Sequence, residues 1–190
     1  TRRLLQRDSW RLRVENMAIS DRSGEMKLRI PVGETGRSTL EEDNHIESLG
    51  GTVESIRVPV RRLDDFDDFG TVGCIKIDVE GHEAAALRGA ENLLRRDKPS
   101  LLVEIEERHK PGSVNTVRSL LHDLGYSGFF YRNGQLNSMD RFDAARDQDV
   151  SNIAGNINRD NKYINNFLFF HSEALPRVQH LLAHAGSRQR

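Results

Sequence analysis

The side chains best suited to chemistry follow one short apolar run, CIKIDVEGH, at residues 74–82. Asp78 and Glu80 lie two residues apart, so on an extended segment their carboxylates point the same way. Such a pair can act as a general base, bind a metal ion or accept hydrogen bonds from a ligand. His82 lies just before a helical stretch, where a helix amino terminus favours the neutral imidazole that a base requires. We therefore expect the reactive site in this segment.

The same residues also have interpretations without chemistry. Asp78 could cap the following helix while Lys76 neutralises it, and His82 could be an exposed residue without a role. An ion pair within a buried strand is an expensive way to form a cap, which favours a functional role for Asp78. Glu83 is most simply a surface charge of the helix, favoured near its positive end.

The elements that position these residues are a strand, a tight turn and a helix. Cys74, Ile75, Ile77 and Val79 favour a buried strand, and Cys74 is expected to be a buried, inert thiol. Gly81 ends the strand and an alanine-rich helix follows over residues 83–96. The next strand, SLLVEIEE, brings Glu104 to a position where it could face the same crevice. In open α/β sheets, ligands bind beyond the carboxyl ends of such strands.

The remaining elements follow from periodicity. Alternation predicts a strand over 10–19 that forms a hairpin with a second strand over 25–31. Residues 32–51 indicate a long surface loop, and 56–60 a short strand. The segment DDFDD at 64–68 could chelate a hard cation, but its spacing favours a short helix with an acidic face. Further expected elements are a helix over 113–124, an Asn133-Gly134 hairpin, an irregular segment over 142–162, a strand at NNFLFFHS and a final helix over 174–184. Strands alternate with helices in this half, which predicts a mostly parallel sheet covered by helices.

The composition narrows the class of protein. With 28 basic and 29 acidic residues among 190, the net charge of −1 gives no drive toward nucleic acid or anionic membranes. The single cysteine excludes an internal disulfide and a cysteine-based zinc site. No apolar run has the length of a membrane helix and no signal-peptide pattern opens the chain, so we expect a cytoplasmic protein. The chain begins at Thr1 within a helix-like phrase, and we expect it to be part of a longer protein.

Several phrases together resemble the FkbM-type methyltransferases. They are VPVRRLDDF (58–66), KIDVEGHEAAALRGAENLL (76–94) and PSLLVEIEERH (99–109), supported by MAISDRSGEMKL, LGYSGFFY (124–131) and the terminal NNFLFFH. The resemblance covers residues 10–171. It implies a Rossmann-like class I methyltransferase domain over residues 1–172, followed by a carboxyl-terminal helix and tail over 173–190.

The resemblance also implies an activity and its residues. Such enzymes methylate hydroxyl groups, often on sugars or natural-product scaffolds, using S-adenosylmethionine. The site then comprises Asp78, Glu80, His82 and Glu104, with Asp78 or His82 as the base and the two glutamates orienting the acceptor or the cofactor. Met17 and Ala18 would border the adenine, and Asp78 would contact the cofactor. No metal ligand is assigned, and the acceptor is a small molecule or glycan.

One family feature has no match in these residues. The glycine-rich loop that binds the cofactor lies upstream of the matching segments, and the missing strands would lie between the strand at Trp10 and the strand at Cys74. Two alternatives therefore stay open. The chain could be a non-catalytic remnant or interaction module of the fold, or a metal-dependent hydrolase that uses Asp64, Asp78 and Glu104.

Overall fold

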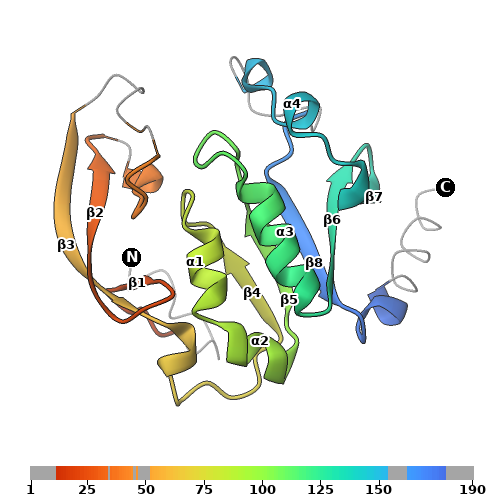
Figure 1. Cartoon of the computed structure of the whole chain (residues 1–190), viewed down its shortest axis with the longest axis horizontal. Helices are drawn as coiled ribbons and strands as arrows, with labels where there is room; N and C mark the ends of the chain where they lie inside the picture. The colour runs from red at the N-terminus through yellow and green to blue at the C-terminus, as the bar shows by residue number, and fades with distance from the viewer. Residues whose placement is uncertain (1–11, 34, 45, 47–51, 154–161, 179–190) are drawn as a thin grey trace.

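The chain forms two β-sheets that lie side by side, with helices on one face of the larger sheet (Figure 1). The computed structural model describes residues 12–33, 35–44, 46, 52–153 and 162–178. The expected helix end at residues 1–9, most of the expected final helix and part of the irregular segment fall outside this part of the chain. Among the described residues, no helix is long and apolar enough to cross a membrane.

The smaller sheet has three strands in the order β1-β3-β2. They are β1 (Ala18–Ile19), β2 (Gly24–Pro31) and β3 (Val53–Arg61). The predicted hairpin between residues 10–19 and 25–31 is wrong. β2 pairs antiparallel with β3 along its whole length, whereas β1 is only two residues long and pairs with β3 in parallel. Local alternation cannot distinguish these pairings, because closing a long loop costs only slightly more free energy than closing a short one.

The larger sheet has five strands in the order β4-β5-β8-β6-β7. They are β4 (Cys74–Ile77), β5 (Ser100–Glu104), β6 (Tyr126–Arg132), β7 (Gln135–Ser138) and β8 (Asn166–His171). Only β4 and β5 are parallel neighbours, so the expected mostly parallel sheet is corrected to a mixed one. The last strand, β8, enters antiparallel between β5 and β6. The predicted turn at Asn133-Gly134 is confirmed, and both residues have positive φ.

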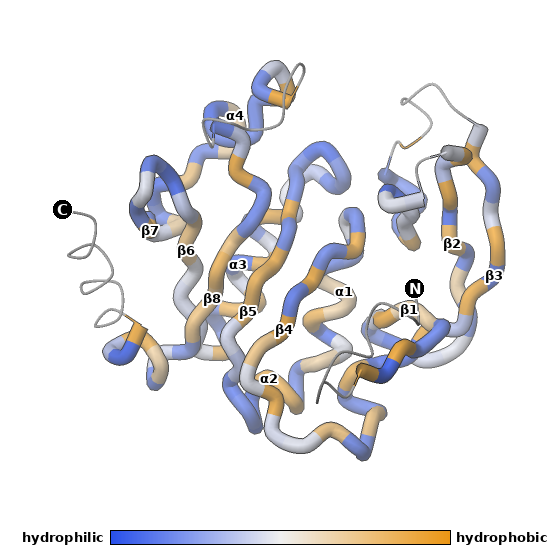
Figure 2. Tube along the Cα trace, turned by 180° about the vertical axis from the view of Figure 1, so that it is seen from behind, coloured by the Kyte–Doolittle hydropathy of each residue, from blue (hydrophilic) through white to orange (hydrophobic). Residues whose placement is uncertain are grey.

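Three of the helices, α1, α2 and α3, gather on one face of the larger sheet, and α4 lies beyond the ends of its strands. Figures 1 and 2 show this arrangement from opposite sides: α1, α2 and α3 lie over the strands in one view and behind them in the other. The helices are α1 (Glu83–Arg88), α2 (Glu91–Asp97), α3 (Ser113–Asp123) and α4 (Ala144–Asp147), with 3-10 turns η1 (Thr35–Arg37), η3 (Leu63–Asp65), η4 (Met139–Arg141) and η5 (Val150–Asn152).

The core fills the space between the sheet and these helices. Val117 and Leu121 of α3 are fully buried, as are Val103 of β5 and Phe167 of β8. This is a mixed α/β fold with a multi-stranded sheet and flanking helices, consistent with the Rossmann-like architecture that the resemblance implies.

The strand β4 is less buried than its apolar sequence suggests. Cys74 is exposed, so the prediction of a buried thiol is wrong. Lys76 and Asp78 are also half exposed, with 51% and 41% of their side chains accessible. Within the described residues β4 pairs only with β5. Alternate side chains of β4 therefore point away from the helices, toward the face without a helix.

The single helix expected over residues 83–96 is two short helices. The helix is interrupted at Gly89. A Cβ atom added to this glycine would lie 1.9 Å from the carbonyl oxygen of Ser20. Asp64 then caps the start of α2, accepting hydrogen bonds from the backbone of Asn92 (3.1 Å) and Leu93 (2.9 Å). The short helix with an acidic face expected here is only the three-residue 3-10 turn η3, and Asp64 is buried against α2 rather than solvated.

Candidate functional site

The turn after β4 positions the residues that the sequence singles out. Glu80 has φ of 51° and Gly81 has φ of 102°, so two successive residues adopt the left-handed region. Such a conformation is costly for a residue with a side chain and concentrates at functional positions. It reverses the chain so that His82 becomes the residue preceding α1. Asp78, Glu80 and His82 all follow the end of β4 at Ile77, and each contacts different partners.

The register of β4 and β5 brings carboxylates from both strands together. Ile77 pairs with Val103, so Asp78 and Glu104 follow side by side at the same edge of the sheet. Asp78 forms an ion pair with Lys76 at 2.7 Å. Asn165 donates a hydrogen bond to Glu104 at 2.8 Å. Burial, and then the nearby charges of Asp78 and Glu106, raise the pKa of Glu104.

Glu80 is the most strongly perturbed carboxyl group at this edge. Its side chain is 14% exposed, and Oε2 lies 3.1 Å from Nε2 of His109. Burial, followed by repulsion from Glu106 and Asp78, raises the pKa of Glu80 to about 7. Burial also lowers the pKa of His109. Glu80 therefore titrates close to neutral pH, the range in which a general base is effective.

Glu106 and Arg108 form the far side of this cluster. Glu106 is almost fully buried and bonds to Arg108 and to the hydroxyl of Tyr163. Burial acts to raise the pKa of Glu106, but the hydrogen bonds from Arg108 and Tyr163 outweigh it and lower the pKa. The sequence prediction assigned no specific role to Glu106, Arg108 or His109. The phrase EIEERH after a buried strand was the available signal, but it could not tell which side chains turn inward.

His82 occupies a different position from the carboxylates. Its Nδ1 lies 2.6 Å from Oε1 of Glu41 and its Nε2 lies 2.9 Å from Oγ of Ser20. Lys110 binds the other oxygen of Glu41 at 2.6 Å. The hydrogen bond from His82, and then Lys110, lower the pKa of Glu41 to about 2. His82 is thus a buried cross-link between β1, the loop after β2 and α1.

Ser20, His82 and Glu41 have the hydroxyl–imidazole–carboxylate order of a hydrolase triad. A nucleophile must be reachable by substrate, whereas Ser20 is fully buried and its hydroxyl also contacts Asp21 and Met26. Gly89 additionally packs against its carbonyl group. These contacts indicate that the three residues hold the two sheets together.

Glu83 is buried rather than exposed on the helix surface, so that prediction is corrected. Its Oε1 accepts a hydrogen bond from the backbone N–H of Gly81 at 2.8 Å. Its Oε2 is buried without a hydrogen-bond partner among the described residues. Burial raises the pKa of Glu83. The side chain thus folds back to close the turn between β4 and α1.

The predicted cofactor residues Met17 and Ala18 lie on the smaller sheet. Ala18 pairs with Val60 in β3, and Met17 is a half-buried residue immediately before it. Ser20, two residues further on, reaches His82. The structure thus brings this segment next to the start of α1, but among the described residues no hydrogen bond or ion pair joins Met17 or Ala18 to Asp78.

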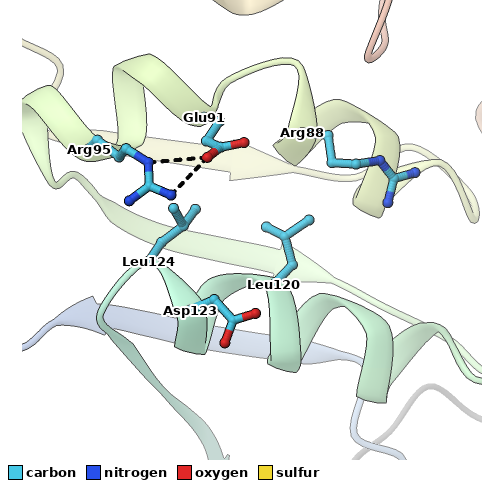
Figure 3. A pocket seen from close by; sticks show the side chains of 6 residues that line it. All are labelled: Arg88, Glu91, Arg95, Leu120, Asp123 and Leu124. Atoms are coloured by element: carbon cyan, nitrogen blue, oxygen red, sulfur yellow. Dashed lines mark hydrogen bonds and ion pairs between the residues drawn. The ribbon is translucent and has the colours of Figure 1, made fainter.

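Three of the hollows in the described part of the chain lie outside this carboxylate cluster. One of about 540 Å³ lies beside His82 and Glu41 and is lined by charged side chains of β2 and α1. A second, of about 440 Å³, lies where α3 meets β6. A third, of about 320 Å³, lies between α1–α2 and α3, where Leu120 and Leu124 face the Glu91–Arg95 ion pair (Figure 3). That third hollow is lined by helix surfaces and the residue that follows α3, without a residue from a strand end.

No group of three or more histidine, cysteine, aspartate or glutamate side chains in the described ranges is arranged to hold a metal ion. Asp64 is engaged as the cap of α2 and pairs with Arg62. No observation therefore favours the alternative of a metal-dependent hydrolase built on Asp64, Asp78 and Glu104.

Comparisons with known proteins address the family. The search of curated proteins gave no match. The crystal structure of methyltransferase FkbM from Methylobacillus flagellatus KT is similar over 60% of this chain and 24% of that one, with 19% sequence identity and a TM-score of 0.38. The chain thus spans about a quarter of that protein. The family model described as the methyltransferase FkbM domain matches residues 5–127. Because this match covers more than half of the residues, the chain belongs to the FkbM methyltransferase family.

Proposed function

We propose that the protein containing this chain transfers a methyl group from S-adenosylmethionine to a hydroxyl group of a sugar or natural-product-like small molecule. Family membership supports methyl transfer in general. The single observation that carries the finer proposal is the half-enclosed Glu80–His109 pair at the end of β4. A carboxylate in that position can accept the proton that an acceptor hydroxyl loses.

The charge at the strand ends suits a cationic methyl donor. Asp78, Glu80, Glu104 and Glu106 repel one another, which contributes to the raised pKa values of Glu80 and Glu104. A positively charged ligand would relieve that repulsion. When bound, S-adenosylmethionine would supply an electrophilic methyl group on a sulfonium. We assign Asp78 and Glu104 to hold it, and the family resemblance adds Met17 and Ala18 beside its adenine.

Glu80 is our candidate for the base, in preference to Asp78 and His82. Both ring nitrogens of His82 are engaged, by Glu41 and Ser20. Asp78 is half exposed and its carboxylate is already paired with Lys76. Glu80 instead lies in a site that excludes most water, with a pKa near the operating pH of a neutral reaction.

The hollow beside His82 offers a place for a part of the acceptor remote from the reacting hydroxyl, because Glu80 does not line it. Its volume of about 540 Å³ is within the range of small-molecule sites. Charged and polar side chains from β2, α1 and the loop after β2 line it, and such groups bind hydroxyl-rich ligands. We expect a small-molecule or glycan acceptor.

The proposal is tested with the protein encoded by the complete gene. We expect calorimetric binding of S-adenosylmethionine and transfer of its labelled methyl group to members of a panel of sugars and natural-product alcohols. Glu80→Gln should lower kcat by about 10²–10⁴-fold, whereas Asp78→Asn should mainly weaken binding of the donor. Glu54→Gln, on exposed β3, is the matched control. Absence of any heat on titration with S-adenosylmethionine would favour a non-catalytic interaction module instead.

A further inference from the structure

The loop after β2 reaches across to the backbone of Glu80. The hydroxyl of Thr39 donates a hydrogen bond to the carbonyl oxygen of Glu80 at 2.7 Å. The side-chain amide of Asn44 donates to the same oxygen at 2.9 Å. Thr39 and Asn44 are 1% and 3% exposed. Two buried donors from one loop therefore converge on a single carbonyl group of the turn after β4; we call residues 39–44 the clamp loop.

The residue that the clamp loop grips is the one with unfavourable backbone geometry. Glu80 has φ of 51°, although it carries a full side chain. A residue stays in the left-handed region only where its surroundings over-determine that conformation. Two hydrogen bonds to its carbonyl oxygen provide this constraint, because rotation of the peptide out of the left-handed region would leave Thr39 and Asn44 buried without their acceptor.

The clamp loop is itself fixed to β2. The buried guanidinium of Arg29 donates to the carbonyl groups of Glu41 (2.8 Å), Glu42 (3.0 Å) and Asn44 (2.8 Å). Arg29 and Thr39 also exchange both of their backbone hydrogen bonds. The clamp loop is thus hydrogen-bonded to β2 on one side and to the turn after β4 on the other.

The side chain of Glu80 points from this fixed backbone toward the loop that follows β5. It meets His109 at 3.1 Å. Asp78, Glu104, Glu106 and Arg108 are the charged groups that influence it. Holding the carbonyl group on one side therefore fixes the carboxylate on the other.

We propose that Thr39 and Asn44 are positioning residues that hold the carboxylate of Glu80 against His109, so that the clamp loop sets the geometry of the methyl-transfer site. Neither residue touches the reacting groups; both act through the backbone of Glu80. The proposal rests on the proposed function in that Glu80 is taken as the base.

The test is a ¹³C NMR titration of the Glu80 carboxyl group in the 190-residue chain without ligand. In the native chain we expect a midpoint at about 7. Thr39→Val removes the hydroxyl at nearly constant shape, and the freed Glu80 should then titrate closer to the ordinary glutamate value of about 4.3. Thr39→Ser keeps the donor and should restore the native midpoint. Thr52→Val, at an exposed threonine, should leave the midpoint unchanged.

Asn44→Ala removes the second donor and provides the test should Thr39→Val fail to fold. A role in stability alone would lower the melting temperature without moving the midpoint of Glu80, and a folded variant with an unchanged midpoint would overturn the proposal. In the enzyme encoded by the complete gene, the acidic limb of the kcat/KM profile should move with the NMR midpoint. If the native enzyme does not transfer a methyl group, the proposed function is contradicted, but the NMR result on Glu80 is unaffected.

Discussion

Glu80 and Glu41 are both largely buried carboxyl groups near the end of β4, but their surroundings shift their ionisation in opposite directions. Glu80 faces other carboxylates, and its pKa is raised to about 7. Glu41 accepts hydrogen bonds from His82 and Lys110, and its pKa is lowered to about 2. A raised carboxyl pKa makes the folded state less stable once the group ionises, whereas a lowered one makes it more stable. The two residues therefore give stability opposite pH dependences.

Glu80→Gln should stabilise the chain at alkaline pH. Because the unfolded pKa lies below the folded one, native Glu80 reduces stability as pH rises from about 4.5 to 7. Above pH 7 the penalty is complete and amounts to at most about 3 kcal/mol. Urea unfolding at pH 5 and pH 8 measures it, with Glu54→Gln as the exposed control. An equal effect of Glu80→Gln at both pH values would show that Glu80 ionises normally.

Glu41→Gln should have the opposite effect. The stability that native Glu41 contributes is present above pH 4.5 and is lost as pH falls toward 2. The variant should therefore lose about 1–3 kcal/mol at pH 7 and little at pH 2.5. The same unfolding measurements check this, and Glu42→Gln in the same loop is the neighbouring control. A loss that persists unchanged at pH 2.5 would contradict the charge-based explanation.

At the scale of the elements, the break between α1 and α2 matters most for assembly. Gly89 lets the end of α1 approach Ser20 at the end of β1, so that a backbone carbonyl occupies the place of a side chain. The φ angle of Gly89 is −70°, which any residue can adopt. Glycine is thus required at position 89 because a larger side chain would not fit, and not because the backbone angles demand it.

Gly89→Ala should destabilise the chain by about 1–3 kcal/mol, the usual cost of overpacking. The added Cβ would lie 1.9 Å from a backbone carbonyl oxygen, which cannot move without shifting β1. Chemical denaturation of the variant checks this. Gly70→Ala is the matched control, since nothing lies within 4 Å of its added Cβ. Equal denaturation midpoints for the two variants would mean that β1 can shift to accommodate the added methyl group at little cost in stability.

Elements whose formation depends on nearby residues could be predicted, and elements that depend on distant partners could not. The amphipathic pattern of 113–124 and the Asn133-Gly134 turn are local signals, and α3 and the β6–β7 hairpin confirm them. The pairing of β1 and β2 with β3 is set by contacts across a long loop, which no local period records. The exposure of Cys74 likewise depends on which strands lie beside β4.

The candidate site shows the same division. The sequence indicated Asp78, Glu80 and Glu104 because strand ends and their spacing are visible in a linear pattern. It could not show that Thr39, Asn44 and Glu41 approach the turn, because these residues lie about 40 positions upstream in a segment predicted as a surface loop. The contacts that orient Glu80 and shift the pKa values of the carboxyl groups could therefore be seen only in the folded structure.

At the scale of the whole molecule, several polar contacts join the smaller sheet to α1 and to the turn before it. His82 links Ser20 and Glu41, and the clamp loop grips Glu80. The larger sheet has its own apolar core with α3. We infer that the smaller sheet can lose its attachment while the larger one stays folded.

His82→Ala should expose this difference. The variant removes the imidazole that bonds both Ser20 and Glu41 and leaves Glu41 with Lys110 alone, at a cost of about 2–4 kcal/mol. Hydrogen exchange should accelerate in β2 and β3 but not in β5 and β8. His122→Ala, at a fully exposed histidine, is the control. Uniform acceleration in both sheets would show that they unfold as one unit.

The exposed edge of β4 has a practical consequence. Cys74 is the single cysteine of the chain and lies on this strand, accessible to solvent. A thiol-reactive fluorophore or nitroxide would therefore label one known position, and no other cysteine would have to be removed first. Because Cys74 and Asp78 are four residues apart, about 13 Å on an extended segment, the emission or line shape of the label would report whether a neighbouring strand covers β4.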